Sequence, residues 1–150
     1  MQKNIIILFF ILLIGCGYKP IYSTNNVNFT INEIEFNRNG LNKIIYNNLS
    51  SYKDKQSKKF IYDIKINSTE EKVTTLKDLK GNPSNFRLSV FVNIEVYEDD
   101  KLKMKKDYVE VFDYENTSKK FELKQYENQI KISILDKISD KIITDLYLVG

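Results

Sequence analysis

The pattern that most restricts the fold is an alternation of apolar and mostly polar residues between positions 86 and 97, with Phe91 as the apolar exception on the second face. Every second side chain from Phe86 to Val96 is apolar. This period of two predicts a long strand with one buried face. Residues 98–101 form a tight polar turn by composition, so residues 102–114 are expected to return as an antiparallel partner strand. A sheet with one apolar face needs a second layer to cover it.

The C-terminal segment, from about residue 118 to 148, has a helical period instead. A straight helix of roughly 28 of these residues would be about 42 Å long, enough to cross a whole small sheet. Its apolar positions recur every three or four residues, and we expect this stripe to be buried against the sheet. The predicted stripe consists of Leu123, Tyr126, Ile130, Ile134, Ile138, Ile142 and Leu146, widened by Ile132, Leu135 and Ile143.

The segment from residue 27 to residue 76 predicts a strand, a helix and a second strand. Residues 27–36 alternate but change phase once, which indicates a bulge or bend. Asn39 can cap the amphipathic helix that follows near residues 40–52. A second strand starts at residues 60–66 and is expected to continue, more weakly, through Leu76. Together with the elements above, these elements predict a two-layer α+β fold that has two helices and four or five strands.

The N-terminus carries a sorting signal. Lys3 precedes an apolar run too short to span a bilayer as a helix, and the run ends at Gly15 and Cys16. This ending resembles the bacterial lipobox, which implies cleavage between these two residues and an N-acyl, S-diacylglycerol lipid on Cys16. The alternative is a short membrane anchor with an incidental cysteine. By resemblance to lipoprotein sorting in well-studied Gram-negative cells, Gly17 in place of Asp implies the outer membrane, with the protein facing the periplasm.

This interpretation divides the chain into a signal peptide at 1–15, a lipidated tether at 16–26 and one domain at 27–150. More than one acyl chain is needed for stable anchoring, and a triacylated cysteine would supply three. The 23 basic and 20 acidic residues nearly balance, which argues against a strongly basic nucleic-acid binder.

Catalytic motifs are scarce. The chain has no histidine, its one cysteine is Cys16, and its five glycines form neither a P-loop nor a dinucleotide fingerprint. The acidic residues at 98–100 match no calcium loop and are better explained as a solvated turn. We therefore expect a protein that is not an enzyme and that binds no metal or cofactor other than its covalent lipid.

Lysines gather in two places, at 101–106 and at 119–124. Surface solvation is the simpler explanation, since acidic residues are interspersed. The alternative is an anion site, because clustered ammonium groups can bind the phosphates of a lipid headgroup.

One segment carries a family resemblance. Residues 16–22, Cys-Gly-Tyr-Lys-Pro-Ile-Tyr, resemble the opening of LptE-type lipopolysaccharide-assembly lipoproteins. Residues 34–41, the strand with Arg87, the hairpin and the long last helix are similar to that family in pattern. The resemblance implies an α+β fold with two helices packed on one face of a mixed four-stranded sheet. It also implies a plug inside the outer-membrane β-barrel LptD, which the plug helps to assemble, and contact between basic residues and lipopolysaccharide. Approximate placement assigns that contact to Lys80, Lys124, Lys101 and Lys103.

Two other classes of function remain open at this level. One is a periplasmic lipoprotein that serves as an auxiliary subunit of a lipid-transport ABC system. The other is a lipid-anchored hydrolase that uses a carboxylate or a Ser/Lys pair.

Overall fold

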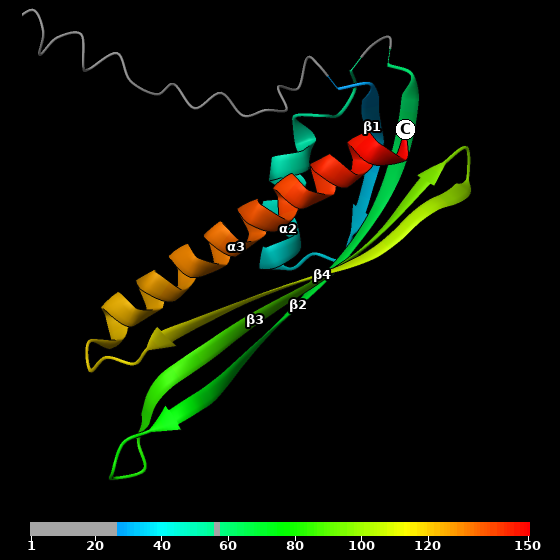
Figure 1. Cartoon of the computed structure of the whole chain (residues 1–150). Helices are drawn as coiled ribbons and strands as arrows, with labels where there is room; N and C mark the ends of the chain where they lie inside the picture. Colours follow the sequence, from blue (N-terminus) through cyan, green and yellow to red (C-terminus); the bar gives the residue numbers. More distant parts are fainter. Residues whose placement is uncertain (1–26, 56–57) are drawn as a thin grey trace, which may run out of the picture.

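A computed structural model describes residues 27–55 and 58–150. Its elements are β1 (Phe29–Phe36), α2 (Gly40–Ser50), β2 (Phe60–Lys77), β3 (Pro83–Glu98), β4 (Lys101–Glu115) and α3 (Lys120–Val149) (Figure 1). The signal peptide, the tether, and the predicted cleavage and lipid sites at Gly15 and Cys16 lie outside the described residues.

The four strands form one mixed sheet in the order β1-β2-β3-β4. β1 and β2 are parallel and are connected through α2, whereas the pairs β2–β3 and β3–β4 are antiparallel. The predicted α+β class with two helices and four strands is confirmed. No fifth strand is present within the described ranges.

The predicted bulge in β1 and the predicted cap of α2 are both confirmed. The β1–β2 register shifts between Ile31 and Glu33, where the hydrophobic phase changes in the sequence. The side chain of Asn39 caps α2 by accepting a hydrogen bond from the backbone N–H of Asn42 at 2.7 Å. The bulge keeps Ile31 and Ile34 both buried although they are three residues apart.

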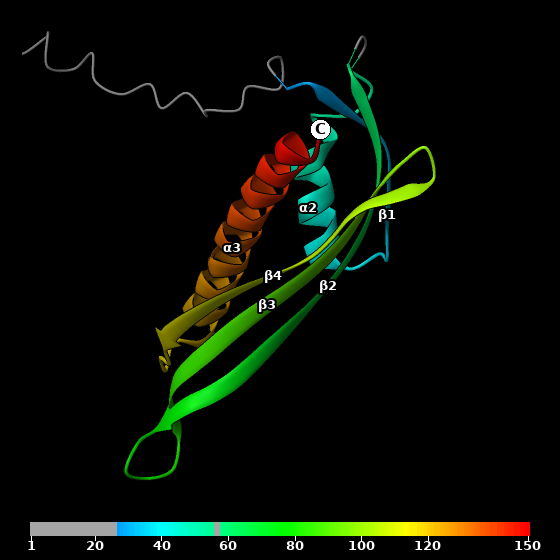
Figure 2. The ribbon, with the colours of Figure 1, turned by 45° about the vertical axis from the view of Figure 1, so that its right-hand side comes forward.

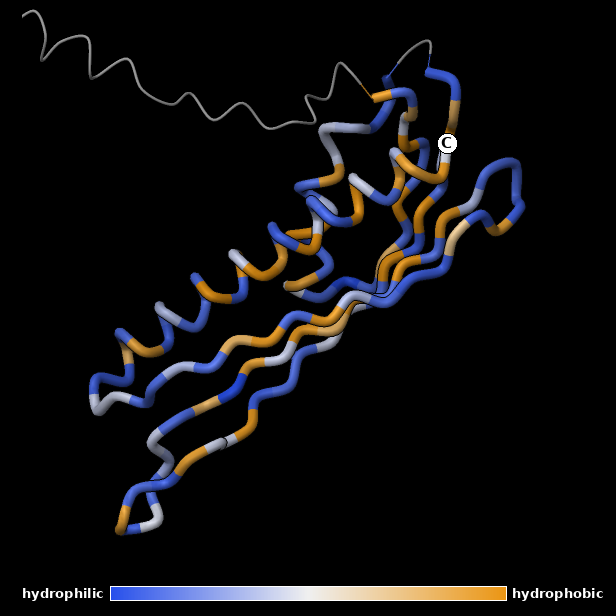
Figure 3. The backbone as a smooth tube through the Cα atoms, in the orientation of Figure 1, coloured by the Kyte–Doolittle hydropathy of each residue, from blue (hydrophilic) through white to orange (hydrophobic). Residues whose placement is uncertain are grey.

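Both helices lie on the same side of the sheet, with α2 beside β1 and β2 and α3 running diagonally along β4 (Figures 1 and 2). The hydrophobic positions of α3 recur on the side turned toward the sheet (Figure 3). The core between the layers contains the alternating face of β3, with Leu88, Val90, Val92, Ile94 and Val96, and the stripe of α3 from Ile130 to Leu146.

Two members of the predicted α3 stripe are not buried, and for them the prediction is wrong. Ile132 is 47% exposed because it follows Ile130 by two residues, which is about 200° around a helix. Tyr126 is 45% exposed, and its ring meets the ring of Tyr114 edge-on at 6.2 Å. The buried stripe is therefore narrower than the sequence pattern.

Ion pairs connect both sides of α3, next to its buried stripe, to strands of the sheet. On the β2 side, Lys131 pairs with Glu70 at 2.6 Å and Glu127 with Lys72 at 2.5 Å. On the β4 side, Glu110 accepts from both Lys137, at 2.7 Å, and Lys141. Because the pairs lie on both sides of the apolar stripe, they fix the rotation of the helix about its axis.

Candidate functional site

The end of the sheet at the β2–β3 turn combines exposed apolar side chains with lysines. The turn is built on Asp78, whose carboxylate accepts from the backbone N–H groups of Lys80 and Asn82, each at 2.8 Å. Gly81 takes a φ of 83°, a conformation that favours glycine. Hydrogen bonds from the Asn82 side chain and backbone, and then from Lys80 and Gly81, hold the pKa of Asp78 below its usual range. The Asp78 carboxylate is therefore satisfied by hydrogen bonds within the turn and does not neutralise the neighbouring lysines.

The first turn of α3 lies at the same end of the molecule. Asn116, just before the helix, binds the base of the hairpin: its backbone N–H donates to the Ser84 carbonyl at 2.8 Å, and its side chain donates to the Pro83 carbonyl at 2.7 Å. Figures 1 and 2 both show the start of α3 at the same end of the sheet as the hairpin, whose turn projects beyond it. The turn and the helix start therefore lie at one end of the molecule.

We call the exposed side chains at this end the distal tip. Three are apolar, Leu76, Leu79 and Phe121, and three are cationic, Lys77, Lys80 and Lys124. None of these lysines has an ion-pair partner among the described residues. Apolar side chains next to unpaired ammonium groups match an amphiphile with an anionic headgroup.

The four predicted lipopolysaccharide-contacting lysines do not form one site. Lys80 and Lys124 belong to the distal tip. Lys101 and Lys103 lie at the opposite end of the sheet, where β3 turns into β4 (Figure 1). Lys103 is neutralised there by Glu98 at 2.6 Å. The sequence analysis missed Leu79 and Phe121, although apolar residues beside a Gly81 turn and at a helix start are a signal that could have been used.

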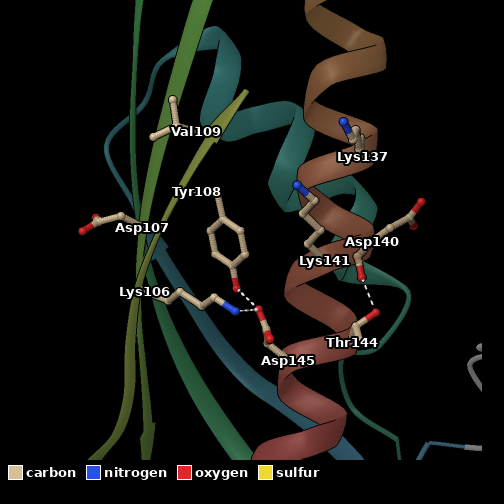
Figure 4. Close-up of a pocket in the computed structure, with 9 residues that line it drawn as sticks. All are labelled: Lys106, Asp107, Tyr108, Val109, Lys137, Asp140, Lys141, Thr144 and Asp145. Atoms are coloured by element: carbon tan, nitrogen blue, oxygen red, sulfur yellow. Dashed lines mark hydrogen bonds and ion pairs between the residues drawn. The ribbon is translucent and has the colours of Figure 1, made fainter. Parts of the chain in front are cut away.

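A groove of about 560 Å³ separates the edge of β4 from α3 (Figure 4). Lys106 and Tyr108 reach across it from β4 to the carboxylate of Asp145, at 2.7 and 2.6 Å. Burial, and then the hydrogen bond to Asp145, raise the pKa of Tyr108. Lys106 and Asp145 are therefore paired with each other across the groove.

No group of acidic side chains in residues 27–55 and 58–150 is arranged to hold a metal ion. Within the same ranges, the helices are too short or too polar to cross a membrane.

No protein-family model matches the sequence, and no curated protein matches it. Solved structures of bacterial lipoproteins have the same fold. Rare lipoprotein B from Shewanella oneidensis superposes with a TM-score of 0.58 at 15% identity, covering 77% of this chain and 93% of that chain. A minor lipoprotein from Acinetobacter baumannii gives 0.57 at 11% identity, covering 75% and 87%. Lipoprotein B from Nitrosomonas europaea gives 0.58 at 11% identity, covering 88% and 91%.

Proposed function

We propose that this chain is an outer-membrane lipoprotein that plugs an LptD-type β-barrel, helps the barrel to assemble, and contacts lipopolysaccharide on its way to the cell surface. The observation that carries the proposal is the shared fold: the superposition includes almost the whole of several bacterial lipoproteins. The lipobox-like ending at Cys16 and the opening heptad at 16–22 support it independently.

The surface of the domain suits a plug. Ion pairs and polar side chains cover much of its outside, as between Arg87 and Asp113 at 2.7 Å on the sheet face opposite the helices. The lumen of an outer-membrane barrel is polar, so a polar plug loses little when it is enclosed. The lipid on Cys16 would keep the plug at the membrane that holds the barrel.

The distal tip is the part of the domain proposed to contact lipopolysaccharide. Its unpaired Lys80 and Lys124 would attract phosphates, and Leu79 and Phe121 would contact acyl chains. Lys101 and Lys103, at the other end of the sheet, are left out of this surface.

Affinity capture of the full chain from detergent-solubilised envelopes, through a C-terminal tag, tests the plug. We expect an LptD-type barrel in stoichiometric amount. Capture of an inner-membrane permease complex instead would overturn the plug and favour the ABC-system auxiliary subunit. A Cys16→Ala variant should lose the barrel through mislocalisation.

Binding of lipopolysaccharide to the purified full chain tests the distal tip separately. Lys80→Ala with Lys124→Ala should weaken binding about thirtyfold, since each of the two lysines near an anionic surface contributes about 1 kcal/mol. The matched control is Lys101→Ala with Lys103→Ala, which removes the same charge from the opposite end. Equal losses in the two double variants would contradict the assignment.

A further inference from the structure

A pocket of about 450 Å³ lies where β1 ends and α2 begins. This volume falls within the range of roughly 300–1,000 Å³ that is usual for small-molecule sites. β1 contributes its last residue, Phe36, and the connection to the helix contributes Arg38 and Asn39. α2 contributes four residues at helical spacing, which therefore lie on one side of the helix: Gly40, Lys43, Tyr46 and Asn47.

Two aromatic rings form the apolar part of this pocket. The ring centroids of Phe36 and Tyr46 are 5.1 Å apart, and the planes of the rings are inclined by 37°. Both side chains pack against the core but keep part of their surface exposed, so they can still bury an apolar group of a ligand. The backbone is also open here, because a Cβ added at Gly40 would meet nothing within 4 Å.

The charged residues that line the pocket are both positive. Arg38 and Lys43 are exposed, and neither has an ion-pair partner among the described residues. Residues 36–53 contain no Asp or Glu, so α2 offers Lys43 no acidic neighbour at helical spacing. Glu35, the acidic residue just before this stretch, pairs with Lys65 at 3.0 Å. Nothing in the surrounding chain therefore neutralises the two cations.

The lysines of two other pockets are neutralised within the chain. Those in the groove between β4 and α3 pair with Asp145 and Glu110. In a pocket of about 710 Å³ between α2, β2 and α3, Lys131 pairs with Glu70 at 2.6 Å. Of these three pockets in the described part of the chain, the one at the start of α2 keeps its positive charge for a ligand.

We propose that this pocket binds a small organic anion with an apolar body. Its carboxylate or phosphate contacts Arg38 and Lys43, and its apolar body packs against Phe36 and Tyr46. The planar guanidinium of Arg38 can donate to two oxygens of either headgroup, and Lys43 adds a second positive charge. The pocket shares no residue with the distal tip, so this proposal does not rest on the proposed function.

Titration of the full chain in a neutral detergent, followed by the NMR signals of the Gly40 and Lys43 backbone amides, tests the pocket. The probes are phenylacetate and phenyl phosphate. We expect saturable shifts, and the probe that binds more tightly shows whether the headgroup is a carboxylate or a phosphate. Acetate and inorganic phosphate should bind about tenfold more weakly, because they bury no apolar surface. Benzylammonium, which carries the ring with a positive charge, should leave both signals unshifted.

Arg38→Gln with Lys43→Gln should weaken binding of the tighter probe by about tenfold or more, since both charge-assisted contacts are lost. Both side chains are exposed, so this variant is expected to fold, and circular dichroism checks it. The matched control, Lys80→Gln with Lys124→Gln, removes the same charge from the distal tip and should bind the probe like wild type.

The comparison of probes needs no variant, so it decides the question even if the double variant fails to fold. The proposal is overturned if neither aromatic anion gives a saturable shift at Gly40 and Lys43, or if benzylammonium shifts the same signals. Acetate and phosphate binding as tightly as the aromatic anions would also overturn it, as would unchanged binding by the folded Arg38→Gln, Lys43→Gln variant.

Discussion

The sheet has a proximal half, which is partly buried, and a distal half, which is exposed, and the pairing of β2 with β3 continues through both. In β2, residues 60–68 alternate between buried and exposed, whereas residues 69–77 are all exposed. Pairing with β1 ends at Ile66, so β2 is an interior strand in its first half and an edge strand in its second. Pairing with β3 continues along both halves to Lys77. In residues 69–77, strand formation therefore depends on hydrogen-bonded pairing with β3 across the hairpin and not on burial of the side chains.

A small aromatic cluster supports the distal half. The ammonium of Lys72 lies 4.0 Å from the centroid of the Phe86 ring, and Tyr114 packs against Phe86 at 5.7 Å. Glu127 from α3 accepts hydrogen bonds from both Lys72 and Tyr114, at 2.5 and 2.8 Å. This cluster ties the distal sheet to α3 with cation–π and charged contacts, where the covered half uses close apolar packing.

The largest expected contrast is in core packing. Ile94→Ala, in the covered half, should lower the free energy of unfolding by about 3 kcal/mol, because Ile94 is fully buried and its loss leaves a cavity. Val111→Ala, at a half-exposed position, should change it by less than about 0.5 kcal/mol. Urea denaturation measures both. Similar losses would mean that the distal sheet has a core of its own.

A buried polar contact marks the boundary between the halves. Asn42 is fully buried, donates to the Asn37 carbonyl at 2.8 Å and accepts from the hydroxyl of Ser68, the last buried residue of β2. Asn42→Ala should cost about 2 kcal/mol, since it leaves buried polar groups without partners. The control Asn47→Ala, at an exposed position of the same helix, should be nearly neutral in the same denaturation experiment.

A smaller effect concerns Glu110, which links β4 to α3. Hydrogen bonds from Lys137 and Lys141 hold the pKa of Glu110 below its ordinary value of 4.5. A lowered pKa stabilises the fold fully above the unfolded value, and this contribution is lost as the pH falls through the folded value. Glu110→Gln should therefore cost about 1 kcal/mol at pH 7 and have a shallower loss of stability below about pH 4.5.

The matched control for Glu110 is Glu35→Gln, because the ion pair of Glu35 with Lys65 is exposed on both sides. Its cost should stay below about 0.5 kcal/mol. If both variants lose stability equally at pH 7, the Glu110 contacts do not hold α3 to the sheet.

The smallest expected effect leaves the global stability unchanged. Amide hydrogens of residues 69–77 should exchange about tenfold faster than those of residues 63–66, because residues 63–66 pair with both β1 and β3 whereas residues 69–77 pair with β3 only. Hydrogen–deuterium exchange with peptide resolution measures the difference. Uniform protection along β2 would show that the strand opens as a single unit.

Local pattern was enough to predict much of this protein. The alternation from Phe86 to Val96, the phase change within 27–36 and the cap at Asn39 all depend on neighbours within a few residues, and each is confirmed. The lipobox-like ending at Cys16 is likewise a property of a short segment, and it stays a prediction. Hydrophobic period and capping chemistry act locally, which is why the sequence alone could determine the α+β class.

Only the tertiary structure decided which distant residues share a surface. The lysines at 101 and 103 and those at 80 and 124 look equivalent in the sequence, but the long hairpins carry them to opposite ends of the sheet. Where the pairing of β2 with β1 stops depends on how far β1 extends along it. These outcomes come from the packing of elements far apart in the chain, which a period of two or 3.6 residues does not encode.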